Sequence, residues 1–293
     1  MTHKSITFLA LHGFIYIWNN FSHVGSTNYI ELEEEAEDRY TFVVSIQDRS
    51  YPNHIKNPER SHICSGTLVS YRHVLTAAHC LQSERKLKYL EVLVGSPNLK
   101  NSKSYYPQLW ISYAHWAKKT NKVVKFDEND VAIMMLSSEV DEKNVIPAVL
   151  SKKKTSETYG FNGFAAGWGS VNDVEAAESM QKAQVTVVGN GMCQEYYKDV
   201  TGLRKEDAEI YTCTISTSHE LLSSGESGGP MYYKGNILLG VNTGLWTKTS
   251  DGSRVVSIYA AIDHLRTFIK EAIKIDDENK CLVAVYWCLA SSS

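Results

Sequence analysis

The residues best suited to chemistry lie in the stretch S-S-G-E-S-G-G-P, residues 223–230. Ser227 stands in a G-x-S-x-G frame that runs from Gly225 to Gly229, with Glu226 directly before the serine. A serine hydroxyl is a weak nucleophile, so it needs a histidine as base, an acid that orients the histidine, and N–H donors for the developing oxyanion. The frame fits two unrelated kinds of catalytic serine, and the rest of the chain has to decide between them.

One kind of catalytic serine sits on a sharp turn between a strand and a helix, and its acid and histidine follow it in the chain. Asp251 and His264 do follow Ser227. However, Ser227 is followed by G-G-P and a strand-like M-Y-Y, where a helix is required. Only 66 residues remain after Ser227, and the chain has no H-G-G-G loop for the oxyanion. The sequence therefore disfavours this arrangement.

The other kind of catalytic serine comes after its histidine and its acid. His79 lies in the run L-T-A-A-H-C, and Asp130 stands directly before the apolar run V-A-I-M-M-L. The order along the chain is therefore His79, Asp130, Ser227. The motifs L-T-A-A-H-C and G-E-S-G-G-P, together with F-A-A-G-W-G between them, resemble those of the trypsin/chymotrypsin-like serine proteases.

This resemblance implies an all-β fold of two six-stranded antiparallel β-barrels with a C-terminal α-helix, and a site between the barrels. The residue pattern points the same way, because many short apolar runs separated by turn residues favour a barrel or a sandwich. The expected strands are 41–47, 62–70, 90–95, 131–136, 164–169, 183–188, 230–233, 237–242 and 256–262. Apolar residues at helical spacing predict the helix: Leu265, Phe268, Ile269, Ala272 and Ile273. The expected parts are a barrel at about 30–145, a barrel at about 146–262, a helix at 263–274 and an extension at 275–293.

The resemblance also assigns roles to residues of the site. Ser227 would be the nucleophile, His79 would take and return its proton, and Asp130 would fix the histidine tautomer. Backbone N–H groups of Gly225 and Ser227 would form the oxyanion hole. Thr243 stands near the place where the family has a serine that hydrogen-bonds the aspartate, and its hydroxyl could serve there.

The substrate pocket is expected around Leu221, with Thr243, Leu245 and Ser257 near its walls. Leu221 lies six residues before Ser227, where the pocket floor should be. An apolar floor with a bulky wall suggests a preference for a small or medium apolar side chain. A shift of one residue would instead place Leu222 or Glu220 at the floor, and Glu220 there would favour Arg or Lys.

Glu226 departs from the family, in which an aspartate normally precedes the serine and pairs with a new α-amino group after activation cleavage. Ile30 is the candidate new terminus, and Tyr29, not a basic residue, precedes it. Breaking such a buried ion pair can cost about 3–5 kcal/mol. Two hypotheses therefore stay open: a working endopeptidase, and a homologue that is inactive or locked as a zymogen and acts by binding.

Six cysteines, an even number, suggest three disulfides in a secreted chain, although the spacing allows 15 pairings. The resemblance implies the bridges Cys64–Cys80 and Cys193–Cys213 and leaves Cys281 and Cys288 to the C-terminal extension, joined or used for association. Two other common family bridges are absent as pairs: Gly163 and Tyr233 stand in place of one, and Ser223 replaces one half of the other. No C-x-x-C pair stands at zinc-finger spacing, so no metal is expected.

Residues 1–26 have a positive Lys4 and an apolar core at 6–18, which is typical of a secretory signal peptide with a cut near Ser26. The other apolar stretches are too short to span a bilayer. A net charge of -3 and a pI of about 6.4 argue against nucleic-acid binding. We therefore expect a secreted, extracellular monomer without a cofactor, whose partners are protein or peptide substrates and protein protease inhibitors.

Overall fold

The computed structural model describes residues 40–82, 87–122, 130–141, 143, 145–169, 175–201, 210–216, 226–248 and 254–274. Several expectations fall outside these residues: the signal peptide, Ile30, Leu221, Gly225, Cys281 and Cys288. The described residues belong to one compact unit, Glu37–Ser293. No helix among them has the length and apolarity needed to cross a membrane.

The first half of the chain forms a seven-stranded antiparallel sheet with the order β5-β4-β1-β2-β3-β7-β6. Its strands are β1 (Val43–Asp48), β2 (His62–Ser70), β3 (His73–Thr76), β4 (Leu90–Val94), β5 (Lys103–Tyr105), β6 (Pro107–Ser112) and β7 (Ala132–Leu136). The central strands β1, β3, β4 and β7 are buried along their whole length. Strands that are buried along their whole length have cover on both faces of the sheet.

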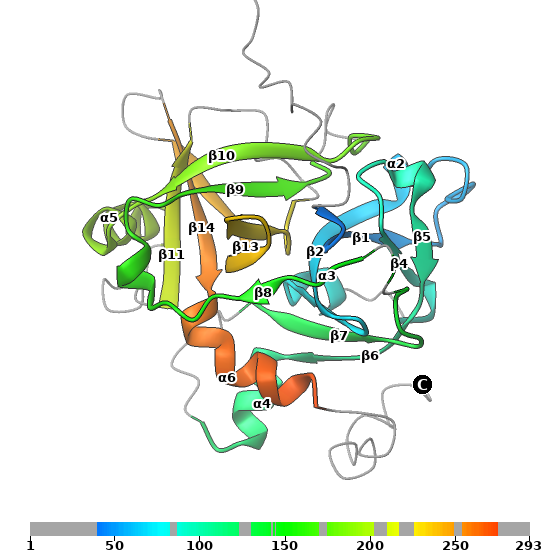
Figure 1. The fold of residues 1–293 in the computed structure, drawn as a ribbon, viewed down its shortest axis with the longest axis horizontal. Coiled ribbons are helices and arrows are strands. Elements are labelled where there is room, and N and C mark those ends of the chain that lie inside the picture. Colours follow the sequence, from blue (N-terminus) through cyan, green and yellow to red (C-terminus); the bar gives the residue numbers. More distant parts are fainter. Residues whose placement is uncertain are drawn as a thin grey trace, which may run out of the picture. The chain divides into compact units, whose positions relative to one another are not determined.

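The second half forms another seven-stranded sheet, with the order β12-β9-β10-β11-β14-β13-β8. Its strands are β8 (Val149–Leu150), β9 (Asn162–Gly167), β10 (Gln181–Val187), β11 (Tyr211–Ser216), β12 (Pro230–Tyr233), β13 (Ile237–Lys248) and β14 (Val255–Ala261). An additional pairing of β12 with β13 closes this sheet into a barrel. Figure 1 shows the strands of the second sheet beside those of the first.

The two-barrel, all-β architecture expected from the sequence is confirmed, with one short additional strand in each sheet. In the second sheet this is β8, which pairs in parallel with β13. In the first sheet it is the three-residue β5, which pairs with β4. The first sheet ends at Leu136 and the second begins at Val149, on either side of the expected boundary.

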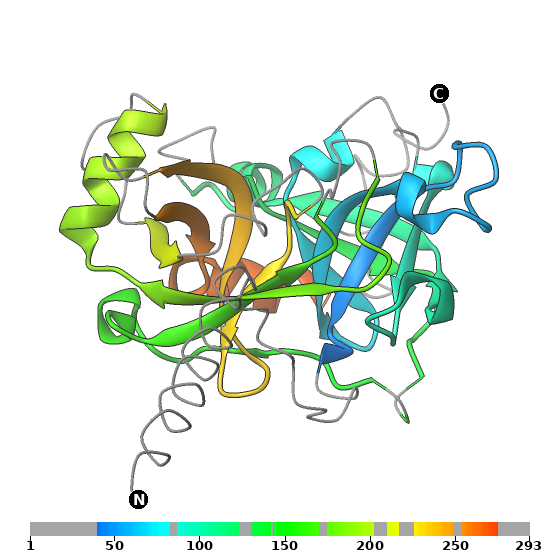
Figure 2. The ribbon, with the colours of Figure 1, turned by 90° about the horizontal axis from the view of Figure 1, so that it is seen from above.

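The helices are short apart from two. They are α2 (Pro58–Ser61), α3 (His79–Gln82), α4 (Tyr113–Lys119), α5 (Asn190–Thr201) and α6 (Ile262–Ala272), with 3-10 turns at Leu87–Tyr89, Leu99–Asn101 and Thr155–Thr158. The predicted C-terminal helix is α6, and it buries the residues whose spacing predicted it, Leu265, Phe268, Ile269 and Ala272. Figure 2 shows α5 on the side of the second sheet that faces away from the first.

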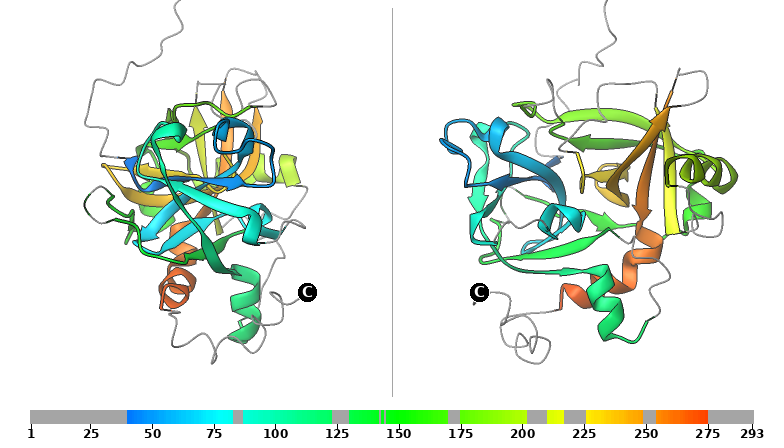
Figure 3. Two further views of the ribbon diagram at one scale, coloured as in Figure 1. Left: turned by 90° about the vertical axis from the view of Figure 1, so that its right-hand side faces the viewer. Right: turned by 180° about the vertical axis from the view of Figure 1, so that it is seen from behind.

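The largest of three apolar clusters in the described part of the chain contains residues of both sheets and of α6. α4 and α6 lie side by side in both views of Figure 3. The ring of Phe268 packs against those of Tyr113 and Trp116, at 5.5 and 5.4 Å between ring centroids. Trp116 also donates its indole N–H to Glu271 Oε2 at 2.8 Å. Because α4 follows β6 and α6 follows β14, this contact links the two halves of the chain.

The two disulfides expected within the described residues are confirmed. Cys64–Cys80 joins β2 to α3, and Cys193–Cys213 joins α5 to β11. Gly163 and Tyr233, which stand in place of another family bridge, are also neighbours. A Cβ added at Gly163 would lie 3.8 Å from that of Tyr233, a usual separation for a disulfide.

Candidate active site

His79 and Asp130 form a close pair that involves both the side chain and the backbone of the histidine. Asp130 Oδ2 lies 2.5 Å from Nδ1 of His79, and Asp130 Oδ1 accepts the backbone N–H of His79 at 2.7 Å. A third bond runs from Ala78 N to the carbonyl of Asp130 at 3.2 Å. Because the carboxylate accepts a hydrogen bond from Nδ1–H, the neutral ring keeps Nε2 as the acceptor for a proton from the nucleophile.

Local structure in the first sheet positions both His79 and Asp130. β3 ends at Thr76, and the buried residues Ala77 and Ala78 lead directly into α3, whose first residue is His79. Asp130 lies one residue before the buried Val131, at the entrance to β7, which pairs with β3. The side chains stay partly exposed, 46% for His79 and 27% for Asp130, so a substrate has access to them.

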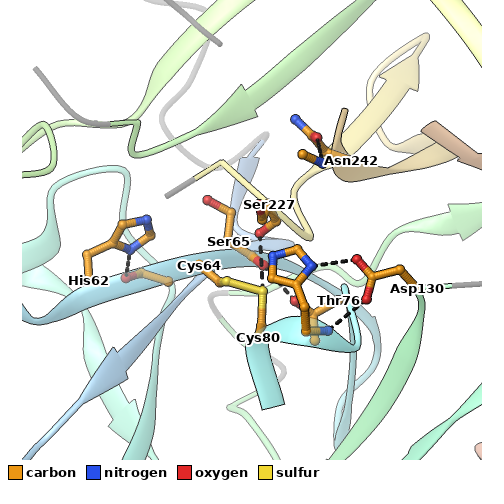
Figure 4. Close-up of a disulfide and its surroundings, with 11 residues drawn as sticks. His62, Cys64, Ser65, Thr76, Cys80, Asp130, Ser227 and Asn242 are labelled. Atoms are coloured by element: carbon orange, nitrogen blue, oxygen red, sulfur yellow. Dashed lines mark hydrogen bonds and ion pairs between the residues drawn. A yellow bond between two sulfur atoms is a disulfide. The ribbon is translucent and has the colours of Figure 1, made fainter. Parts of the chain in front are cut away.

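The disulfide behind His79 connects the pair to the nucleophile. Cys80 follows His79 in α3, and its sulfur lies 3.8 Å from the backbone oxygen of Ser227. Figure 4 shows Ser227 above the sulfur of Cys80 and Asp130 to the right of this disulfide. The sulfurs of Cys64 and Cys80 are close enough to His79 for a metal site, but the disulfide removes the thiolates that would bind an ion.

Ser227 lies on a tight turn, Glu226–Gly229, that leads into β12. The N–H of Gly229 donates to the carbonyl of Glu226 at 2.9 Å, which closes the turn. The Ser227 carbonyl accepts from Ser65 N in β2 at 2.9 Å. The N–H of Gly228 donates to the carbonyl of Asn242 in β13 at 2.7 Å. The nucleophile turn is thus held by strands of both sheets.

Gly228 is required by this geometry. Its φ is +83°, a conformation that side chains with a Cβ rarely adopt. A Cβ at this position would collide with Thr76 and with the carbonyl of Ser65, and would lie 2.8 Å from the backbone nitrogen of Ala77. Steric crowding and the positive φ therefore explain why a glycine follows the serine at position 228.

Known proteins with a similar sequence identify the family of this chain. A family model described as Trypsin matches residues 31–269. The chain belongs to the trypsin family. Trypsin iota of Drosophila melanogaster is 26% identical over 72% of this chain and 79% of its own length. Trypsin 5G1 of Aedes aegypti is 25% identical over 78% of this chain and 82% of its own length.

Solved structures share the fold of this trypsin-family chain. Mouse neuropsin, described as a serine protease expressed in the limbic system, has a TM-score of 0.61 and 21% identity, and the match covers 82% of this chain and 97% of that one. The scabies mite inactivated protease paralogue S-D1 has a TM-score of 0.60 and 19% identity, over 80% and 92%. The Vibrio cholerae VesB protease has a TM-score of 0.61 and 21% identity, over 81% and 65%.

The base His79 and the nucleophile Ser227 are not hydrogen-bonded to each other in this trypsin-family site. His79 and Ser227 both lie in the described part of the chain, and the structure records no hydrogen bond between Nε2 of His79 and Oγ of Ser227. Such bonds are often long in ligand-free enzymes and tighten when substrate binds. The three residues named from the sequence are brought together, with the acid–base contact formed and the base–nucleophile contact not formed.

Glu226 is buried, with 6% of its surface exposed. A Cβ added at Gly167 would lie 3.6 Å from its Cγ. Burial raises the pKa of Tyr259 to about 12, and the charge of Glu226 acts in the same direction. The hydroxyls of Thr214 and Ser257 oppose this rise of the Tyr259 pKa. Glu226 and Tyr259 thus both lie in the buried interior of the protein.

Two of the expected pocket residues lie in that region. Ser257 is buried in β14, directly opposite Thr214 of β11. Thr243 is buried in β13, where its hydroxyl donates to the carbonyl of Ile258 at 2.9 Å. Since a hydroxyl has one proton, the expectation that Thr243 could serve Asp130 is wrong. The backbone of Leu245 pairs with Ile258 in the same sheet.

Sequence reasoning missed Asn242, which contacts both sides of the nucleophile turn. Its carbonyl accepts from Gly228 N, and its own N–H donates to the carbonyl of Gly229 at 2.9 Å. Its side-chain Oδ1 accepts from Gly244 N at 2.7 Å. The signal was present in the sequence, because N-T-G inside a strand-like run marks a turn or a bulge.

Proposed function

We propose that this trypsin-family protein is a secreted serine endopeptidase that works through an acyl-enzyme. Ser227 Oγ attacks the scissile carbonyl carbon while Nε2 of His79 takes its proton and then gives it to the leaving amine. Water attacks the acyl-enzyme, its proton passes to His79, and Ser227 leaves with that proton. The observation that carries this proposal is the double hydrogen bond of His79 to Asp130, at 2.5 and 2.7 Å, which orients the base.

The proposal includes the surroundings of the triad. The N–H groups of Gly225 and Ser227 would bind the oxyanion, and the α-amino group of Ile30, freed by cleavage after Tyr29, would pair with Glu226. The burial of Glu226 supports a pairing inside the barrel. The two disulfides are typical of extracellular chains, which supports secretion after loss of residues 1–26. Protein substrates and protein protease inhibitors would be its partners, and we propose that it acts as a monomer.

A mass measurement on the secreted protein tests the activity. Intact masses are read before and after a fluorophosphonate probe, with Ser227→Ala as the control. We expect one probe adduct on the wild type and none on the control, and a starting mass that places the N-terminus at Ile30. A folded protein that gains no mass at any concentration or time would refute the endopeptidase.

A second candidate is a homologue that is inactive or locked as a zymogen and acts by binding. The open contact between His79 and Ser227 favours it. So does Glu226, whose extra methylene would move a buried ion pair that normally shapes the oxyanion hole, and a misplaced oxyanion donor costs about 10²–10³ in rate. The scabies mite paralogue is an inactivated protease by its own description, so this fold is compatible with either state. No adduct before limited proteolysis and one adduct after it would identify a zymogen.

The side chain preferred before the cleaved bond needs its own test. We propose a small or medium apolar residue there, in a pocket built around Leu221, Leu245 and Ser257. A panel of peptides that differ only at this position measures the preference as relative kcat/KM. Cleavage restricted to Arg or Lys would refute the apolar pocket and would place Glu220 at its floor.

A further inference from the structure

α4 and α6 lie side by side (Figure 3), and their contacts show that they run in the same direction. The ring centroid of Tyr113, in the first turn of α4, lies 5.9 Å from that of His264 near the start of α6. One turn further along α4, the indole N–H of Trp116 donates to Glu271 in the last turn of α6 at 2.8 Å. The C-terminal ends of both helices therefore lie at the same end of the pair.

Lysines gather at this common end. The lysine cluster consists of Lys118, Lys119 and Lys122 at the end of α4 and directly after it, and of Lys270 and Lys274 at the end of α6. All five are exposed. Each helix has a local reason for its lysines, since a positive charge interacts favourably with the carbonyls of a helix C-terminus. The parallel packing of the two helices then brings the two sets of lysines together.

The positive charge of the lysine cluster is little compensated by its neighbours among the described residues. Glu271 is the single acidic residue in the described last turns of the two helices, and its carboxylate accepts the indole N–H of Trp116. No ion pair with a described residue is recorded for Lys118, Lys122, Lys270 and Lys274. Concentrated charge of one sign attracts mobile ions of the other sign, and salt screens it.

His115, in α4, responds to the charge of the cluster. Burial lowers the pKa of His115 first, and the charges of Lys119 and Lys118 lower it further. A negative charge near a histidine acts in the opposite direction, so an anion bound at the cluster would raise this pKa. His115 is therefore a built-in reporter of anions that bind there.

The side chains around the cluster narrow the choice of anion. None of the large apolar side chains that are exposed in the described chain lies on α4 or α6, whereas protein interfaces and membrane-bound helices use such anchors. Trp116 is buried under Lys122, so it offers no face on which nucleic-acid bases could stack. The cluster contains no arginine, the residue that binds phosphate groups through paired hydrogen bonds. The surface is thus suited to a ligand that is held by charge alone.

We propose that the lysine cluster at the common end of α4 and α6 binds sulfated polysaccharide, a linear polyanion of the extracellular space. The sulfate groups lie against the ammonium groups of both helices, and the release of the small ions that they displace favours the complex. The choice of a polysaccharide rests on the secretion that the proposed function includes. Because no member of the cluster belongs to the catalytic site, the bound chain holds the protein in place and leaves Ser227 free to react.

Binding of a heparin fragment of defined length to the full chain tests the proposal, with Ser227→Ala as the parent so that no proteolysis occurs. We expect the Kd at physiological salt to rise about tenfold in Lys118→Gln/Lys122→Gln, and the slope of log Kd against log salt to fall by roughly 1 to 2. Lys270→Gln/Lys274→Gln should have a similar effect, because the ligand contacts both helices.

Lys152→Gln/Lys154→Gln is the matched control, since it removes the same charge from two exposed lysines of another segment. That segment lies at the opposite end of α6, where the N–H of Thr155 donates to Asp263 at 3.2 Å. The control should bind within about twofold of the parent, because salt screens charges beyond about 8 Å. Equal weakening in the control and in the cluster variants would show that the lysine cluster is not the site.

The His115 reporter and competing ligands complete the test. Saturating heparin fragment should raise the pKa of His115, followed by proton NMR, and binding without this rise would contradict a site at the cluster. Equal affinity for polyglutamate or for vesicles rich in phosphatidylserine would overturn the assignment to a sulfated polysaccharide. A full chain that does not bind the fragment at physiological salt would refute the proposal and leave the endopeptidase intact, because binding does not involve Ser227.

The chain itself supplies a competitor for the cluster. The acidic run I-D-D-E, residues 275–278, follows α6 in the sequence and lies outside the described residues. The proposal expects the heparin fragment to bind the full chain with this run intact. Binding that appears only in Asp276→Asn/Asp277→Asn/Glu278→Gln would assign the lysine cluster to this segment and overturn the polysaccharide site.

Discussion

The two halves of the site are built differently. His79 and Asp130 come from the first sheet and hold each other through two direct hydrogen bonds at the entrance to neighbouring strands. The Ser227 turn makes its backbone bonds to both sheets, through Ser65 and Asn242, and depends on Gly228 for its shape. The acid–base half is thus a local structure, whereas the nucleophile half depends on distant contacts.

This difference says where control of activity should lie. A local pair that is already formed leaves little for activation to change. The Ser227 turn contacts β13 and contains the buried Glu226. A movement of either β13 or Glu226 should therefore change its conformation. Variants in the acid–base half should therefore alter catalysis with little change in stability, and variants in the nucleophile half should alter both.

The largest effect is expected for Asp130→Asn. The amide cannot accept both N–H groups of His79 as the carboxylate does, and an amide N–H facing Nδ1 favours the wrong tautomer. In proteases with this triad the change lowers kcat by about 10⁴. The measurement is kcat on a peptide ester together with urea denaturation, which should shift by less than about 1 kcal/mol because Asp130 is partly exposed.

Asp141→Asn, at an exposed aspartate five residues after the end of β7, serves as the control and should keep full activity. If Asp130→Asn unfolds the protein, the acid–base half is not the independent local structure described above.

Gly228→Ala tests the other half, and here stability and activity should fall together. The added Cβ meets backbone atoms of Ser65 and Ala77, which do not move easily, and the positive φ adds strain. Overpacking and strain of this kind sum to about 3 kcal/mol of unfolding free energy. Urea denaturation measures this loss, and probe labelling should disappear.

Gly160→Ala provides the comparison, with a φ of +79° and nothing within 4 Å of a Cβ. It should cost about 1 kcal/mol and leave labelling unchanged. Equal losses in the two variants would mean that the turn around Ser227 is not closely packed.

The two disulfides sharpen the comparison because they close loops of similar length. Their cysteines are 16 and 20 residues apart, so either pair of alanine substitutions should cost about 3 kcal/mol. Only Cys64–Cys80 touches the site, since Cys80 follows His79 and its sulfur contacts the Ser227 carbonyl. Loss of this bridge should slow probe labelling about tenfold, measured at a temperature where both variants stay folded. Equal slowing on loss of Cys193–Cys213 would contradict a site-specific role.

The sequence predicted the bounds of some strands closely. β2 and β12 occupy the ranges expected, 62–70 and 230–233. The strand predicted at 237–242 is too short, because N-T-G resembles a turn. In the structure N-T-G forms a bulge, and β13 continues to Lys248. A bulge of this kind is stabilised by Tyr259 and Ile258 on another strand, which no local pattern reveals.

Four of the described helices, α2 to α5, and several strands were not predicted, and two of these elements show why. α5 begins with N-G, a turn signal, and it is fastened by the Cys193–Cys213 bridge to β11. β8 has two residues and exists only through its pairing with β13. In the site, residue types and their order identified His79, Asp130 and Ser227. N-T-G marked a turn or a bulge, but the contacts of Asn242 with the nucleophile turn lie across the sheet and could not be predicted.

The smallest effect is expected at the α4–α6 contact, which belongs to neither half of the site. Burial lowers the pKa of His264 below its ordinary 6.5, and the nearby charge of Asp263 opposes this only in part. Tyr113 faces the same ring, with its hydroxyl 3.4 Å from Nε2. The unfolded chain then binds a proton more readily than the folded one, so stability is full above about pH 6.5 and falls as the pH drops below it.

His264→Gln should weaken this loss, measured as the difference in melting temperature between pH 7.5 and pH 5.0. The pKa of His115 is also lowered, by burial first and then by Lys119 and Lys118, so His115→Gln should act in the same direction. Its effect should be smaller, because His115 lies on the exposed face of α4. Probe labelling at pH 7.5 should be unchanged in both variants, since neither residue contacts Ser227, His79 or Asp130. Slower labelling by His264→Gln would show that the link between the halves controls the nucleophile turn.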